Sequence, residues 1–118
     1  MLTKEQILAC EDIVYEEVEV PEWGGTVLVK SLTGAERDWL EMSVLQEKKP
    51  KDTTANMMNF RAKLASLSIC DEKHVRLFTE KDVEALTGKS AIALQRVFNV
   101  AQRLSGLTAE DAEQLTKN

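Results

Sequence analysis

The residue types best suited to catalysis or metal binding are scarce in this 118-residue chain. The two cysteines, Cys10 and Cys70, lie far apart, and His74 is the single histidine. A structural zinc site needs about four ligands at characteristic spacings, and a Cys or Ser nucleophile needs a base, usually His, with an orienting partner. We therefore expect no metal, no cofactor and no enzymatic activity. The cysteines are interpreted as buried, reduced thiols, and whether they ever pair stays open.

Phosphate-binding and acid–base motifs are equally weak. Gly88-Lys89-Ser90 matches only the end of a Walker A motif and lacks the upstream glycine. We interpret it as the end of one helix, with Gly88 in a left-handed conformation, followed by the start of another. The carboxylates of Glu16, Glu17, Glu19 and Glu22 lie on or beside an expected strand, and we interpret them as a solvated face.

A recurring threonine pattern indicates where helices begin. Four times an apolar residue precedes a threonine that is followed three positions later by an acid or an amide: Thr3 with Gln6, Thr33 with Glu36, Thr79 with Asp82, and Thr108 with Asp111. The hydroxyl can cap a free backbone N–H of the first helical turn, and the third residue can reach back to the cap. The sequence thus predicts four helix starts.

The remaining elements follow from periodicity. Alternation in 14–20, turn residues in 21–25 and a second apolar run to 30 predict a β-hairpin over about 14–30. Helical spacing or caps predict helices over about 4–10, 34–47, 55–70, 80–87, 90–104 and from 108 onward. We expect one domain over 1–118, with helices from about 34 to 116. The fold class is mainly α with a small N-terminal β-hairpin, a compact helical domain of five or six helices.

Composition argues against two classes of partner. The net charge of −5 disfavours nucleic acid, because affinity for phosphate backbones depends largely on Lys and Arg. No apolar stretch approaches the length of a membrane span, and residues 1–6 lack the pattern of a secretory signal. We expect a cytoplasmic protein without a membrane partner.

Charge is segregated along the chain. Residues 1–22 carry one lysine against seven acids, whereas residues 48–63 carry five basic residues against Asp52 alone. Opposite patches can pair head to tail between copies. The candidate contact residues on the two sides are Glu16, Glu17, Glu19, Lys48, Lys49 and Lys51. A simple solvated surface is the alternative.

Trp23 and three methionines are candidate contacts with other proteins. Trp23 lies in the expected turn, and Trp is enriched at binding hot spots; packing on its own hairpin is the alternative. Met42, Met57 and Met58 flank the basic segment. Flexible thioethers suit adaptable apolar surfaces, although filling of the core is their more common role.

Three stretches together resemble the tail assembly chaperones of long-tailed bacteriophages. They are residues 18–38, which begin Val-Glu-Val-Pro-Glu-Trp-Gly-Gly-Thr-Val, residues 61–86 with Leu-Phe-Thr-Glu-Lys-Asp-Val, and residues 97–107. The likeness covers nearly the whole chain, and no single motif in it is diagnostic.

The resemblance implies a role in building a long, non-contractile tail. Such chaperones are thought to coat the tape measure protein, a long helical ruler, and to bring the major tail protein to it. They act in the host cytoplasm and are absent from the mature virion. The resemblance also implies self-association and a short form that can be accompanied by a frameshifted longer form. A structural adaptor retained in the virion and a small nucleic-acid-binding regulator are the alternatives.

Overall fold

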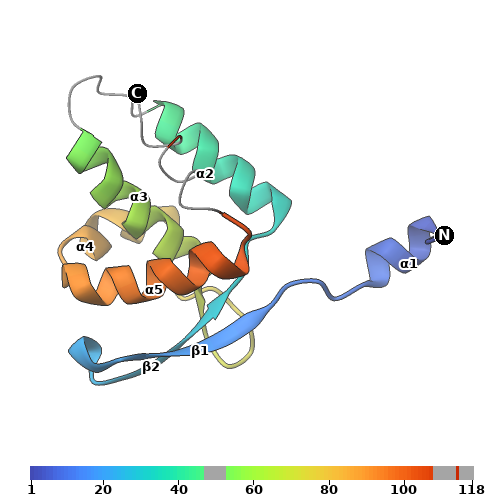
Figure 1. Ribbon diagram of the computed structural model, residues 1–118, viewed down its shortest axis with the longest axis horizontal. Coiled ribbons are helices and arrows are strands. Elements are labelled where there is room, and N and C mark those ends of the chain that lie inside the picture. Colours follow the sequence, from blue (N-terminus) through green and yellow to red (C-terminus); the bar gives the residue numbers. More distant parts are fainter. Residues whose placement is uncertain (47–52, 108–113, 115–118) are drawn as a thin grey trace.

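The chain folds into helices gathered on one side of a small sheet, with one short helix set apart (Figure 1). A computed structural model describes residues 1–46, 53–107 and 114, with the backbone alone for 45–46 and 53–58. The α-helices are α1 (Lys4–Ala9), α2 (Gly34–Gln46), α3 (Thr53–Ser68), α4 (Val83–Thr87) and α5 (Ala91–Leu104). The strands are β1 (Tyr15–Val20), β2 (Gly25–Lys30) and β3 (Ile69–Cys70), and the 3-10 turns are η1 (Pro21–Trp23) and η2 (Glu80–Asp82). The predicted fold class is confirmed.

Three of the four predicted threonine caps are confirmed. Each hydroxyl accepts a hydrogen bond from a backbone N–H in the first turn: Thr3 from Gln6 at 3.2 Å, Thr33 from Glu36 at 3.1 Å, and Thr79 from Lys81 at 3.3 Å. The reciprocal bond, from the cap N–H to the side chain three residues on, is present in all three. The fourth, Thr108, lies outside the described residues. Local capping chemistry therefore sets where these helices begin.

The predicted hairpin is also confirmed. β1 and β2 pair antiparallel from Tyr15 opposite Lys30 to Val20 opposite Gly25. Gly24 closes the turn with φ of 74°, a left-handed conformation that glycine adopts without steric cost. Val18 and Val20 are buried, whereas the residues between and before them are more exposed. This alternation gives the sheet one face for the core.

A third strand corrects the prediction of a helix over 55–70. The helix begins at Thr53 and ends at Ser68, and Ile69 and Cys70 pair with β2 opposite Val29 and Leu28. The free edge of β2 offers these two residues backbone partners that a continued helix would leave unused. Pairing between distant segments therefore overrides the local helical pattern.

The prediction for Gly88 was wrong. Its φ is −81°, in the right-handed region, because the end of α4 tightens: the N–H groups of Gly88 and Lys89 donate to the carbonyls of Ala85 and Leu86 at 3.2 and 3.0 Å. Ser90 then caps α5. The start of the preceding helix is also a 3-10 turn rather than α-helix over 80–82. Gly106, with φ of 70°, does close α5 as expected.

The core lies between the sheet, α3 and α5. The apolar face predicted for α5 is confirmed, since Leu94, Val97, Phe98 and Ala101 are buried. On α3, Phe60, Leu64 and Leu67 are buried as well. The Phe60 and Phe98 rings meet edge to face, with centroids 5.8 Å apart and planes at 70°. Such aromatic pairs add to the stability gained from burial alone.

Candidate interaction surfaces

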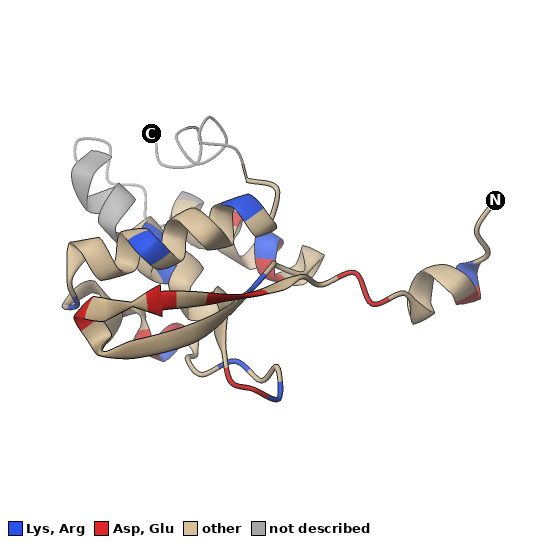
Figure 2. Cartoon of the chain, turned by 60° about the horizontal axis from the view of Figure 1, so that its bottom comes forward, with Lys and Arg blue, Asp and Glu red and all other residues tan. Residues whose placement is uncertain are grey.

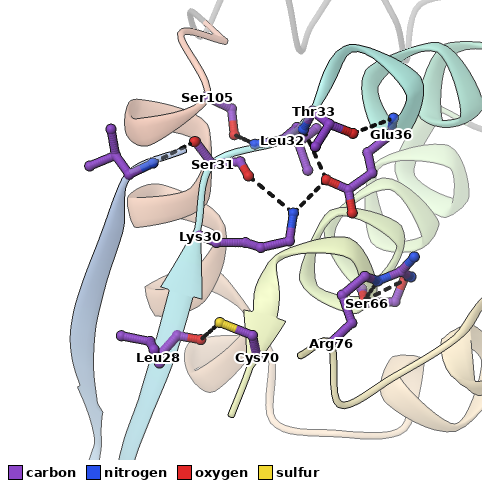
Figure 3. A network of polar contacts seen from close by, with 11 residues as sticks. Leu28, Lys30, Ser31, Leu32, Thr33, Glu36, Ser66, Cys70, Arg76 and Ser105 are labelled. Atoms are coloured by element: carbon purple, nitrogen blue, oxygen red, sulfur yellow. Dashed lines mark hydrogen bonds and ion pairs between the residues drawn. The ribbon is translucent and has the colours of Figure 1, made fainter. Parts of the chain in front are cut away.

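A buried ion pair fixes the hairpin against the helices (Figure 3). Lys30 ends β2, and its ammonium group donates to the carboxylate of Glu36 in the first turn of α2 and to the Ser31 carbonyl at 3.1 Å. Glu36 also accepts from the Thr33 N–H at 2.9 Å. One carboxylate thus serves as helix cap and as counterion to a buried lysine. The sheet and α2 are held in one relative orientation.

The same corner defines where the N-terminal segment leaves the folded body. Val14 and Ser31 continue the pairing beyond β1, since the Ser31 N–H donates to the Val14 carbonyl at 2.8 Å and the Val14 N–H donates to Ser31 Oγ at 3.0 Å. Nearby, the Leu32 N–H donates to Ser105 Oγ at 3.0 Å. The residues before Val14 lie beyond this anchored point.

Helix α5 neutralises part of the acidic hairpin. Arg96 donates two hydrogen bonds to the Glu22 carboxylate, at 2.8 and 3.1 Å, and Arg103 donates one to Glu16 at 2.6 Å. In Figure 2, acidic positions of the hairpin strand lie beside a helix that carries basic positions, and both ion pairs join the hairpin to α5. The Arg96 hydrogen bonds lower the pKa of Glu22, while Glu22 and Glu16 raise the pKa values of Arg96 and Arg103. Of the three acids predicted to contact another copy, Glu16 is therefore already paired within the chain, as is the neighbouring Glu22.

The two remaining acidic candidates, Glu17 and Glu19, remain open to solvent. Glu17 and Glu19 are exposed and alternate with the buried valines of β1, so they point to the outer face of the sheet. Glu16 lies on the inner side with Val18, which is why it reaches α5. Strand alternation thus divides the acidic run into a paired part and a solvated part.

The basic side of the predicted contact is smaller than the sequence indicates. Lys48, Lys49 and Lys51 lie outside the described residues. Lys63 is only 4% exposed, and its ammonium group donates to the Ser43 carbonyl at 3.3 Å. The guanidinium of Arg61 lies over the Phe98 ring, 5.9 Å from its centroid. These two downstream charges therefore help to pack α3 and are not part of an exposed basic patch.

Trp23 lines an apolar pocket at the tip of the hairpin. The pocket has a volume of about 460 Å³ and is lined by Trp23, Phe78, Asp82, Ala85, Leu86 and Lys89. Trp23 is half-buried and packs against the core, and its contact with another protein stays a prediction. Sequence reasoning missed the rest of this pocket, because more than fifty residues separate Trp23 from Phe78 and no spacing links them.

Of the three methionine candidates, only Met42 has a described side chain. Met42 is 54% exposed on α2, so it is not a core residue. The backbone of Met57 and Met58 belongs to the first turns of α3, and their side chains lie outside the described part. Met42 is accordingly the methionine for which the structure gives a surface position.

Helix α1 projects away from the rest of the chain (Figure 1). None of its six residues is buried. Leu2 and Leu8 are each 75% exposed and Ile7 is 56% exposed. Residues 1–13, here called the N-terminal arm, therefore present large aliphatic side chains to solvent.

The histidine and the two cysteines, the residue types best suited to catalysis or metal binding, lie in three different environments. Over the described ranges, no three His, Cys, Asp or Glu residues are grouped as metal ligands would be. The His74 ring stacks on Tyr15, with centroids 3.7 Å apart, which gives this histidine a packing role. Cys70 is buried, and burial raises the pKa of its thiol. Cys10 is exposed on the N-terminal arm, so the expectation that it is buried was wrong; both cysteines are free.

None of the described helices combines the length and apolar character needed to cross a bilayer.

Comparison with known proteins assigns the fold and a family. A family model described as phage tail assembly chaperone matches residues 4–117. The solved structure of the bacteriophage HK97 tail assembly chaperone superimposes with a TM-score of 0.63, covering 85% of this chain and 94% of that one at 18% identity. At this identity, the structural likeness shows a shared fold. No curated protein sequence matches the chain at a significant level.

Proposed function

The chain belongs to the phage tail assembly chaperone family, and we propose that within tail assembly it coats the tape measure protein and recruits the major tail protein to it. The observation that carries this proposal is the family match over residues 4–117. In this proposal the protein acts in the host cytoplasm during infection, catalyses no reaction and is absent from the mature virion. A frameshifted longer form and copies of the same chain are further partners.

The surface properties support a binding role. A protein that keeps a long helical ruler soluble needs accessible apolar side chains that make weak, reversible contacts. The chain presents such side chains at three separate places: the N-terminal arm, the Met42 position on α2, and the pocket beside Trp23. Each is small, which suits contacts that must be released when the tail tube forms.

Co-expression with the ruler tests the proposal. The tape measure protein of the same phage should be insoluble alone, and soluble and co-purified when the chain is present. A Met42→Asp variant should fold normally and, if α2 forms part of the contact, recover less soluble ruler. A ruler that stays insoluble with the intact chain would contradict the proposal.

Mass spectrometry of purified virions separates the two structural alternatives. A chaperone that leaves during assembly should be missing from particles that contain the tail tube and the tape measure protein. An adaptor retained in the tail would be detected in them at stoichiometric amounts.

A further inference from the structure

We infer that the N-terminal arm of one copy docks into the pocket beside Trp23 of the next copy, linking chains head to tail. This inference rests on the proposed function in that it names the contact by which the coating chaperone associates with itself. It is carried by two features of the described residues: an arm whose apolar side chains have no cover, and an apolar pocket at the other end of the hairpin.

The arm requires a partner surface. Helices shorter than about 12–15 residues are marginal in water, and α1 has six residues with none buried. Its capping box fixes where the helix starts, but one cap contributes only about 1 kcal/mol. Burial of the arm's aliphatic side chains, Leu2, Ile7 and Leu8, requires contact with another surface. A defined helix with exposed aliphatic side chains is the form of a segment that inserts into a groove.

The position of the pocket directs the arm to a different copy. The arm precedes the first residue of β1, whereas Trp23 follows its last. To enter its own pocket, the arm would have to reverse at Val14 and run back along the whole strand. In Figure 1 the arm and the hairpin tip extend in opposite directions. An arm at one end of the molecule and its pocket at the other end produce a heterologous contact, which repeats into rings or filaments.

Charge favours the pocket beside Trp23 over the larger pocket on the sheet. The larger pocket, of about 610 Å³, is lined by Glu17, Asp71 and Glu72 against Lys73 alone among charged groups. The arm is itself acidic, with Glu5, Glu11 and Asp12 against Lys4, and like charges oppose docking there. The pocket beside Trp23 balances Asp82 with Lys89 around an aromatic and aliphatic floor.

A mixing experiment tests the geometry of the contact. Ile7→Asp/Leu8→Asp changes only exposed arm residues, and Ala85→Glu places a longer side chain at the pocket from an exposed position on α4. In sedimentation velocity the intact chain should associate beyond a dimer. Each variant alone should associate at least about tenfold more weakly. Their equimolar mixture should form a one-to-one dimer and stop, since one arm and one pocket remain. Met42→Asp serves as a control and should associate like the intact chain.

Cross-linking provides a readout that does not depend on how well the pocket variant folds. Cys10 is exposed on the arm, whereas Cys70 is buried with a raised thiol pKa, so mild oxidation should engage Cys10. With Lys89→Cys at the pocket rim, oxidation should give a ladder of covalent oligomers. Glu72→Cys, at the larger pocket, should give none. A ladder from Glu72→Cys alone, a Lys89→Cys product that stops at a dimer, or a monomeric intact chain would overturn the inference.

Both experiments use this chain alone. Loss of the ladder would leave the tape measure role in place, whereas an intact ladder with an insoluble ruler would refute that role and leave the arm contact standing.

Discussion

Lys30 and Glu36 form an ion pair whose side chains are only 8% and 15% exposed, at the corner where β2 turns into α2. The pair is shielded by the surrounding chain, and Glu36 also caps the helix through the Thr33 N–H. Breaking a buried pair from one side leaves an uncompensated charge, which costs far more than losing an exposed pair. This corner is therefore the polar contact on which the orientation of the hairpin most depends.

We expect Glu36→Ala to lower the free energy of unfolding by about 3–5 kcal/mol, because it leaves the buried Lys30 ammonium without a counterion and removes a helix cap. Lys30→Met should cost less, since Met keeps the apolar stem and leaves Glu36 bonded to Thr33. Glu41→Ala is the matched control, because it removes the exposed Arg37–Glu41 pair of the same helix and should cost at most about 1 kcal/mol. Urea unfolding measures all three; equal losses would contradict a buried pair.

Leu40 is fully buried where α2 meets the core. Leu40→Ala should destabilise the fold by about 2–5 kcal/mol, because it removes buried methyl groups and leaves a cavity. Met42→Ala, two residues along the same helix but exposed, should change stability by no more than about 0.5 kcal/mol. Thermal unfolding followed by circular dichroism distinguishes the two, and similar losses would mean that α2 packs through a different face.

Gly24 and Gly25 lie side by side in the hairpin turn but in different conformations. No atom lies within 4 Å of a Cβ at either position, whereas only Gly24 has a positive φ. Gly24→Ala should therefore cost about 1–2 kcal/mol through backbone strain alone, and Gly25→Ala should be nearly neutral. A Gly24→Asn variant should lose less than Gly24→Ala, because Asn tolerates the left-handed region better. Chemical unfolding of the three variants provides the comparison.

The Glu22–Arg96 pair gives a defined dependence on pH. Arg96 holds the pKa of Glu22 below its ordinary value of 4.5, so the pair contributes stability above about pH 4.5 that is lost as the pH falls through the pKa of the folded state. Glu22→Gln should thus reduce stability slightly at neutral pH and converge with the intact chain in acid. Arg96→Gln should give the same profile, and a double variant should add no further loss. The midpoints of urea unfolding, measured across the acid range, give the stability of each variant relative to the intact chain. Differences that persist in strong acid would contradict the prediction.

Salt separates the two modes of self-association. Changing Lys48, Lys49 and Lys51 to Glu should weaken association in low salt if the basic segment meets the acidic residues of another copy, because such exposed contacts are screened at high ionic strength. The apolar arm contact should persist in high salt and should be lost in Ile7→Asp/Leu8→Asp instead. Sedimentation at two salt concentrations compares both variants; unchanged sedimentation of the triple variant would reject the electrostatic contact.

The sequence by itself determined features that depend on neighbouring residues. The threonine caps at Thr3, Thr33 and Thr79 could be predicted because a cap and its partner lie three residues apart. The hairpin and the buried face of α5 followed from periods of 2 and 3.6 residues. The family resemblance rested on the same local patterns and is confirmed by the match over residues 4–117.

Only the tertiary structure decided features that bring distant residues together. Ile69 and Cys70, predicted as helix, form a strand because the edge of β2 was free to pair with them. The tertiary structure paired Glu16 with Arg103 and stacked His74 on Tyr15, and it joined Trp23 to Phe78 and Leu86 in one pocket. It also left the N-terminal arm uncovered. Burial and pairing across the fold depend on how elements meet in space, which no spacing along the chain records.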